Sequence, residues 1–208
     1  MFPSLTRDDV FRIETPRLWL RWPRLDDAPM IARWVRLREG AALSDSFHVD
    51  MTIADIAARL QRDREANEAG RALNFVLVPQ GRDGEVIGRV DVGMQPGGRL
   101  ELGYHLDPVS WGRGLMTEAV TALTEQTFDL MPIANISAHV RPENATSIRV
   151  LKKCGFKLTG SGEHDSPVTG RYFVHTYALT RSRPSALLAA KHRHSSRRSA
   201  QHALVGLV

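Results

Sequence analysis

Residues 107–119 combine the residue types that bind a phosphate group. Their sequence is D-P-V-S-W-G-R-G-L-M-T-E-A, with Arg113 between Gly112 and Gly114. Because glycine has no Cβ, these two positions can turn the backbone sharply and bring it close to a ligand. Arg113 can add a charge-assisted hydrogen bond to a phosphate oxygen. The stretch therefore predicts an anion-binding turn.

The neighbouring segments indicate what holds this turn. Leu100–Leu106 alternates between apolar and polar residues, which predicts a strand, and Thr117–Phe128 has the pattern of a helix. The first N–H groups of a helix lack intrahelical partners, and the helix dipole favours negative charge there. A strand, a glycine turn and a helix start in this order predict a pyrophosphate site.

Two common phosphate motifs do not occur in the chain. The P-loop pattern G-x-x-x-x-G-K-[ST] is missing, and Thr117 stands where the dinucleotide pattern G-x-G-x-x-G would have its third glycine. A lone G-x-G also fits an ordinary turn between a strand and a helix. The choice between the two depends on the rest of the sequence.

Three segments resemble the GNAT superfamily of N-acetyltransferases, and in particular its RimJ/RimL-like branch. Trp111–Ala119 is similar to the acetyl-coenzyme A loop of that superfamily. Pro142–Phe156 is similar to the N-x-x-S…G-F segment of the branch, and Glu14–Arg21 to the family's first strand. The resemblance covers roughly residues 13–180.

The coenzyme loop departs from the general GNAT pattern, [QR]-x-x-G-x-[GA], at two positions. Gly114 takes the place of the central glycine, whereas Trp111 stands in the Gln/Arg position and Met116 in the final small-residue position. Both departures are typical of the RimJ/RimL-like branch.

The resemblance implies an acetyl-coenzyme A-dependent N-acetyltransferase. It implies a mixed α/β fold with a central, mostly antiparallel twisted sheet flanked by helices, and acetyl-coenzyme A at a splayed strand-turn-helix. The acetyl group would pass to a primary amine by direct attack. The residues expected to hold the coenzyme are Leu106, Trp111, Gly112, Arg113, Gly114, Leu115, Met116, Thr117 and Asn144.

Amide formation needs a base for the amine and an acid for the departing thiolate. Ser147 matches the family serine often assigned to the thiolate, because the tyrosine that many other members use is replaced here by Leu151. Glu101, on the strand before the loop, is the candidate base. Ser147 could instead be a packing residue and Glu101 a surface carboxylate, and His105 and His139 are further candidates for proton relay.

The acceptor pocket is expected from the first two helices, the connection 41–51 and a loop at 159–171. The candidates to line it are Trp34, Phe47, His48, Glu163, His164 and Asp165. The resemblance suggests a protein N-terminus, but relatives also acetylate small amines and antibiotics. The sequence leaves both acceptor classes open.

The periodicity of the rest of the chain predicts the elements that carry these residues. Helices are expected from Asp26 to Val35, from Thr52 to near Gly70, over 117–130 and from Asn144 to Lys153 with Gly155 after its end. Strands are expected at 17–21, 73–78, 85–92, 100–106, 136–140, 156–158 and 171–179.

Composition and charge divide the chain in two. Hydrophobic residues make up 42% and charged residues 25% of the 208, as in a globular domain with a core. Residues 181–208 hold six Lys and Arg and no Asp or Glu, and without them 22 basic residues face 23 acidic ones. We expect one acetyltransferase domain over 1–180 and a basic tail over 181–208.

The remaining features limit the class of protein. Cys154 is the only cysteine, so no disulfide within the chain or cysteine-based metal site is expected. No apolar run has the length of a membrane span and no signal peptide precedes Arg7, which favours a cytoplasmic protein. A homodimer is possible. A non-catalytic acetyl-coenzyme A sensor also stays open, as does a protein that binds nucleic acid through the tail.

Overall fold

The structure is a computed structural model that describes residues 1–37, 47–166 and 170–181. An eight-stranded sheet forms its centre, in the order β1-β2-β3-β4-β5-β6-β8-β7. The strands are β1 (Arg12–Glu14), β2 (Leu18–Arg21), β3 (Ala72–Pro79), β4 (Gly88–Met94), β5 (Leu100–Leu106), β6 (Asn135–Val140), β7 (Lys157–Ser166) and β8 (Gly170–Thr180).

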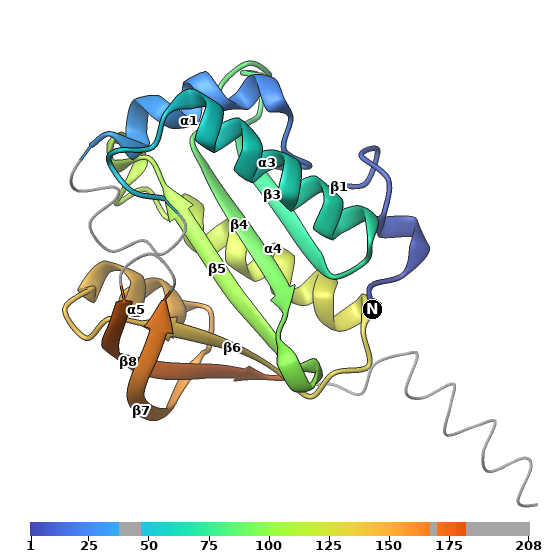
Figure 1. Cartoon of the computed structure of the whole chain (residues 1–208). Helices are drawn as coiled ribbons and strands as arrows, with labels where there is room; N and C mark the ends of the chain where they lie inside the picture. The colour runs from blue at the N-terminus through green and yellow to red at the C-terminus, as the bar shows by residue number, and fades with distance from the viewer. Residues whose placement is uncertain (38–46, 167–169, 182–208) are drawn as a thin grey trace, which may run out of the picture.

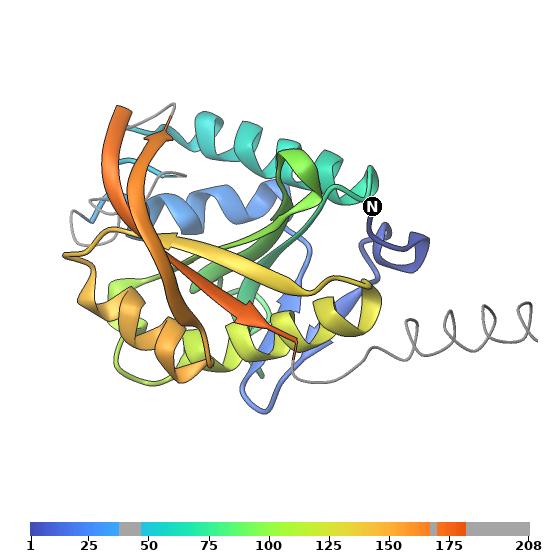
Figure 2. The ribbon, with the colours of Figure 1, turned by 90° about the horizontal axis from the view of Figure 1, so that it is seen from below.

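Helices cover both faces of the sheet. The helices α1 (Ala28–Val35) and α3 (Ile53–Glu68) pack on one face, and α4 (Leu115–Leu130) and α5 (Ala145–Lys153) lie on the other (Figures 1 and 2). Short 3-10 helices lie at η1 (Ser4–Thr6), η2 (Leu25–Asp27), η3 (Pro96–Gly98) and η4 (Pro108–Ser110). Within the described residues no helix combines the length and the apolar character needed to cross a membrane.

The predicted mixed α/β fold with a mostly antiparallel sheet is confirmed. Every described pair of neighbouring strands is antiparallel except β5–β6, which α4 connects as a parallel pair. A parallel pair needs such a crossover, because its strands run in the same direction. The sheet therefore changes its pairing at one place, between β5 and β6.

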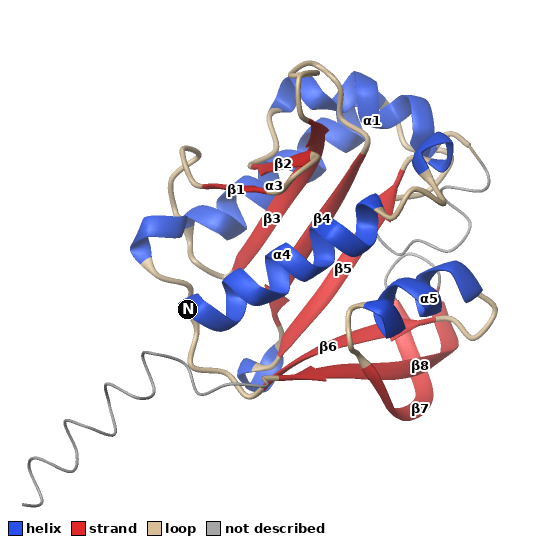
Figure 3. Ribbon diagram, turned by 180° about the vertical axis from the view of Figure 1, so that it is seen from behind, coloured by secondary structure: helices blue, strands red, loops and turns tan. Residues whose placement is uncertain are grey.

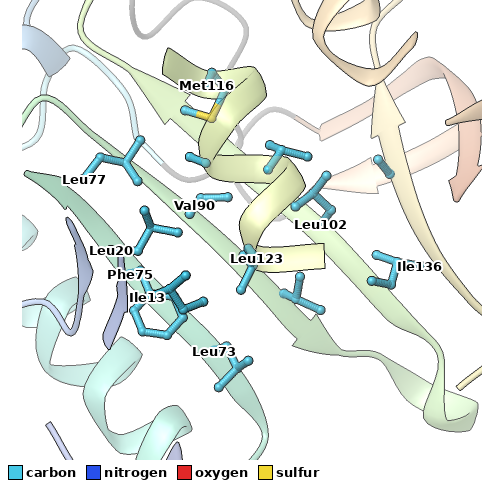
Figure 4. Packing of buried hydrophobic residues seen from close by; sticks show 14 of the residues in the cluster. Ile13, Leu20, Leu73, Phe75, Leu77, Val90, Leu102, Met116, Leu123 and Ile136 are labelled. Carbon is cyan, nitrogen blue, oxygen red and sulfur yellow. The ribbon is translucent and has the colours of Figure 1, made fainter. Parts of the chain in front are cut away.

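The core has one layer on each side of the sheet. On the α4 side, Met116 and Leu123 of the helix pack with Leu20, Phe75 and Val90 of the strands (Figure 4). On the other side, Ile31 of α1 and Ile56 and Leu60 of α3 belong to the same buried cluster as Val76 and Val78 of β3. Residues 72–78 of β3 are buried because both layers cover this strand.

The helix boundaries follow the predicted end signals closely. The Thr52 hydroxyl accepts a hydrogen bond from the Asp55 N–H (3.1 Å), and the Asp55 carboxylate accepts one from the Thr52 N–H (2.9 Å). This reciprocal capping fixes the start of α3, and Gly70, with a φ of 63°, follows its end. α4 begins at Leu115, directly after Gly114, and not at Thr117.

The expected loop at 159–171 is wrong, because β7 continues to Ser166 and pairs with β8. β7 is an edge strand with mostly exposed side chains, so its sequence lacks the apolar alternation that identifies half-buried strands. Gly160 and Gly162 weaken the pattern further. The segment that the sequence predicted as a loop of the acceptor pocket is therefore part of the β7–β8 hairpin.

Candidate active site

The site begins where β5 and β6 separate. Their only pairing in register joins Glu101 to Ser137, and the Ser137 hydroxyl donates to the Leu100 carbonyl (2.9 Å). Beyond this point the two strands diverge (Figure 3). β5 stays paired with β4 as far as Leu106, so its other edge opens into the gap.

The backbone alternation of β5 decides which groups face this gap. The Asp107 N–H donates to the Ile87 carbonyl across β4 (2.8 Å), so the backbone groups of Leu106 and Tyr104 point away from β4. The Leu106 carbonyl accepts a hydrogen bond from the Trp111 indole (2.8 Å). The Leu106 N–H is left directed toward the gap, as the expected role of Leu106 requires.

A cavity of about 820 Å³ occupies the gap and reaches both faces of the sheet. It lies within the usual size range of a ligand pocket. Eight of the nine predicted coenzyme-binding residues line it, together with Glu101 and Ser147: Leu106, Trp111, Gly112, Gly114, Leu115, Met116, Thr117 and Asn144. The Arg113 side chain is exposed and is not part of this lining.

The glycine turn has the conformation that its sequence predicts. Gly112 has a φ of 74° and Gly114 a φ of 75°, a region that other residues rarely adopt. Gly114 caps α4 without a side chain, so no side chain of the cap occupies the first N–H groups of the helix. These N–H groups remain available to an anion.

Contacts from the first strands brace this turn. The Arg17 guanidinium donates to the Arg113 carbonyl (2.9 Å) and to the Glu118 carboxylate (2.6 Å), and the Thr15 hydroxyl also donates to Glu118 (2.7 Å). Burial opposes the charge of Glu118, but these hydrogen bonds prevail and lower its pKa. Glu118 thus ties the helix start to β2.

Ser147 lies in a hydrogen-bonded cluster at the start of α5. The Asn144 side chain caps the helix by accepting from the Ser147 N–H (3.0 Å). The Ser147 hydroxyl lies 2.6 Å from the Tyr104 hydroxyl, which also contacts the Ser147 carbonyl (3.1 Å). Burial raises the pKa of Tyr104, so its hydroxyl stays protonated. Leu151 is buried in the core.

Glu101 faces the opposite side of the sheet from Ser147. Its carboxylate lies 3.0 Å from His139 Nδ1, and this hydrogen bond raises the pKa of His139. The His139 ring lies 5.0 Å from the His164 ring of β7, and all three residues line the cavity. The candidate base and acid therefore reach one cavity from its two faces.

Of the six residues predicted to line the acceptor pocket, His164 lines the described cavity, whereas the exposed Glu163 and Asp165 of β7 and the three N-terminal candidates do not. Trp34 and Phe47 are buried core residues with exposed fractions of 2% and 0%, and His48 is exposed. Trp34 stacks on His105 with the ring centres 4.8 Å apart, which places His105, not Trp34, next to the cavity. Most of the connection 41–51 lies outside the described residues.

Sequence reasoning missed Tyr104, Asp91 and Tyr172, which also line the cavity. Tyr104 lies 43 positions from Ser147, and no spacing rule connects a strand to a helix at that distance. The alternation in β5 does place Tyr104 on the same face as Leu102 and Leu106. The approach of α5 to this face, however, is determined by the tertiary fold and not by the local sequence pattern.

The cavity fits coenzyme A on chemical grounds. Its lining offers the uncapped N–H groups of α4 and the cationic side chains of Arg141, Arg149 and Lys153 to phosphate groups. Its continuation between β5 and β6 offers unpaired strand edges to an extended arm. These are the features that a long ligand with phosphates at one end needs.

Comparison with known proteins agrees with this geometry. The family described as "Acetyltransferase (GNAT) domain" matches residues 17–157. An uncharacterized N-acetyltransferase, p20, of Bacillus licheniformis is 32% identical over 149 residues, which span 70% of this chain and 82% of p20.

Solved structures show the same fold. The Salmonella typhimurium acetyl transferase described as modifying the N-terminal serine of ribosomal protein L7/L12 has a TM-score of 0.71 at 21% identity, covering 83% of this chain and 100% of that one. RimJ of Mycobacterium smegmatis, in complex with a coenzyme A disulfide, has a TM-score of 0.69 at 24% identity, covering 92% and 97%.

Proposed function

This chain belongs to the GNAT family of acetyl-coenzyme A-dependent N-acetyltransferases, and we propose that its acceptor is the free N-terminal amine of a protein. One observation carries the proposal: a single cavity between β5 and β6 joins the coenzyme loop and Ser147 on one face to Glu101 on the other. Bound acetyl-coenzyme A supplies a thioester whose acyl carbon an amine can attack.

The chain's part in the reaction is to handle two protons. An N-terminal amine has a pKa near ~8, so a base has to remove a proton from it at neutral pH. Glu101, held by its hydrogen bond to His139, takes this proton either directly or through water. The amine nitrogen thereby keeps its lone pair for attack.

The second proton goes to the sulfur that leaves. Ser147 lies where the cavity passes α5, and its hydroxyl donates this proton. Tyr104, 2.6 Å from the Ser147 oxygen, holds the hydroxyl in place and can return a proton to it. The ammonium group loses two protons in all: Glu101 takes one and passes it to solvent, and the other leaves the nitrogen for solvent as the amide forms. Ser147, which has given its proton to the thiolate, regains one from solvent through Tyr104.

The choice of a protein N-terminus rests on relatives and on the shape of the cavity. The Salmonella typhimurium relative is described as modifying an N-terminal serine. Here the acceptor face of the cavity is walled by His164 and Tyr172 of the β7–β8 hairpin and is open to solvent. A chain end can enter such an opening.

The test is acetyl transfer to three matched acceptors. Peptides with a free N-terminus, the same peptides with a blocked N-terminus and an internal lysine, and simple alkylamines are incubated with acetyl-coenzyme A, and thiol release and product mass are measured. We expect transfer to free N-termini only. Equal kcat/KM on lysine or alkylamines would contradict the acceptor assignment, and thiol release that no amine stimulates would contradict the transfer itself.

A further inference from the structure

Asp91 of β4 lines the cavity on the face of the sheet that also carries Glu101 and His105. It pairs in register with Gly103, and both residues line the cavity. A Cβ added at Gly103 would come within 2.8 Å of Asp91 Oδ2. The missing side chain at Gly103 therefore leaves room for the carboxylate to lie directly over β5.

One oxygen of Asp91 is open to a ligand. The Arg89 guanidinium donates to Oδ1 (2.9 Å), whereas Oδ2 has no hydrogen-bond partner among the described residues. The Asp91 side chain keeps an exposed fraction of 23%. Glu101, a diagonal neighbour on the same face, likewise binds His139 through Oε1 and has no described partner at Oε2. Two carboxylate oxygens thus face the cavity together.

The charges around Asp91 favour the binding of a cation next to its carboxylate. Burial raises the pKa of Asp91; Asp63 and Glu101 raise it further, and Arg89 and Arg59 lower it, so three carboxylates share two arginines here. Arg89 is shared with Asp63 (3.3 Å), which also pairs with Arg59 of α3. Because buried carboxylates are costly without enough cationic partners, an ammonium ion next to Asp91 would relieve this repulsion.

An unpaired atom of His105 marks the same face of the cavity. His105 Nε2 is shielded from solvent and lacks a hydrogen-bond partner in the described part of the chain. Burial, together with Arg89, lowers the pKa of His105 to about 4, so its ring is neutral. His105 lies two residues beyond Gly103 on β5 and lines the cavity. A small movement of the side chains that shield this nitrogen would let a polar atom of a ligand bound at Asp91 contact and satisfy it.

We infer that Asp91 selects the acceptor: the acceptor's ammonium group donates to Asp91 Oδ2 and Glu101 Oε2, and a carbonyl oxygen close to it accepts a hydrogen bond from His105 Nε2. The inference rests on the proposed function. It assigns the ammonium group of the acceptor's N-terminal residue to Asp91 and Glu101, and the carbonyl oxygen of that residue to His105. Asp91 binds the amine, and Glu101 then takes its proton.

The test measures binding, independently of turnover. The wild-type protein, saturated with desulfo-coenzyme A, is titrated calorimetrically with L-alaninamide, with isopropylamine, which lacks the carbonyl, and with propionamide, which lacks the ammonium group. We expect alaninamide to bind most tightly, isopropylamine more weakly and propionamide not measurably. Equal binding of alaninamide and propionamide, or no binding of alaninamide, would overturn the inference.

Three variants test which residues contribute to alaninamide binding. Asp91→Asn should weaken alaninamide binding by about tenfold or more, since it removes a partly buried charge partner, while desulfo-coenzyme A affinity stays unchanged. His105→Phe keeps the stacking on Trp34 and should reduce alaninamide binding to the level of isopropylamine. Asp165→Asn changes an exposed carboxylate of β7 that is not among the residues lining the cavity, and should keep wild-type alaninamide affinity.

The outcomes separate this inference from the proposed function. Wild-type alaninamide affinity in Asp91→Asn, or equal losses in Asp91→Asn and Asp165→Asn, would overturn the role of Asp91 even if peptides are acetylated. Selective alaninamide binding without any peptide acetylation would contradict the proposed function instead.

Discussion

At the scale of single residues, the proposed acid chemistry depends on one hydroxyl with fixed surroundings. Ser147 is held through its N–H by Asn144 and through its oxygens by Tyr104. A hydroxyl held in this way can deliver a proton at one point in the cavity. In the proposed mechanism its neighbours set its position and proton supply, whereas the proposed phosphate site lies elsewhere, at the start of α4.

Ser147→Ala should therefore separate turnover from binding. Loss of an acid group costs roughly a hundredfold in rate, so kcat should fall by about that factor while the dissociation constant of acetyl-coenzyme A stays within about twofold. Steady-state kinetics and calorimetry measure the two quantities. Ser161→Ala, an exposed β7 serine that is not among the residues lining the cavity, serves as the matched control. Full activity in Ser147→Ala would rule out the acid role.

His105 gives the fold a dependence on pH of defined sign. Its pKa of about 4 lies below the ordinary value of 6.5, because burial disfavours the charged ring. A lowered pKa means that the stabilising contribution is complete above pH 6.5 and is lost as the pH falls toward 4. In His105→Phe, the free energy of unfolding should decline less between these values than in the wild type. Parallel declines in chemical denaturation across this range would contradict the assignment.

The predictability of individual residues depended on whether their role is local. Gly112 and Gly114 were predicted because their role lies in the backbone, and Asn144 and Ser147 because they match positions of a family segment that the sequence resembles. Asp91 and Tyr104 were not found, because their roles come from a cross-strand glycine and from a helix distant in sequence. The predicted acceptor residues Trp34 and Phe47 are large aromatics, which fill a core as readily as a pocket.

At the scale of elements, the coenzyme loop is supported by the strand that packs next to it. Arg17 and Thr15 hold Glu118 at the start of α4, and Arg17 also holds the Arg113 carbonyl. A carboxylate in a first helical turn generally complements the helix dipole. Here it also joins two segments about a hundred residues apart in the chain.

Glu118→Gln should loosen the turn and weaken coenzyme binding. The substitution removes the ion pair with Arg17 and leaves the helix in place, so acetyl-coenzyme A should bind about three- to tenfold more weakly. Calorimetric titration measures the change. Glu125→Gln, which changes an exposed carboxylate farther along α4, should bind like the wild type. Identical affinities in the two variants would show that the brace does not support the coenzyme site.

The elements themselves were largely predictable, because capping and periodicity act within a few residues. The capping box of α3 and the glycine after α5 fixed helix ends that the structure confirms. β7 was underestimated because its pairing with β8, and not its own apolar pattern, makes it a strand. An edge strand with glycines and exposed side chains carries little local signal.

At the scale of the whole molecule, the site follows from the change in strand pairing. Antiparallel strands run from β1 to β5, and the crossover through α4 then places β6 parallel to β5 with a single pair in register. The gap beyond this pair is a cavity that opens on both faces of the sheet. Acid and base can therefore act on one reaction from opposite sides without contacting each other.

The most direct measurement is the thermal stability of the wild-type protein with acetyl-coenzyme A, desulfo-coenzyme A or NADPH. A ligand at about a hundred times its dissociation constant stabilises the fold by roughly 2.7 kcal/mol. The account predicts that both coenzyme A compounds raise Tm and that NADPH does not. It also predicts that Gly114→Trp, which places a side chain in the turn, remains folded and loses the shift. No shift with saturating acetyl-coenzyme A, or an equal shift with NADPH, would contradict the assignment of the gap between β5 and β6 as the coenzyme site.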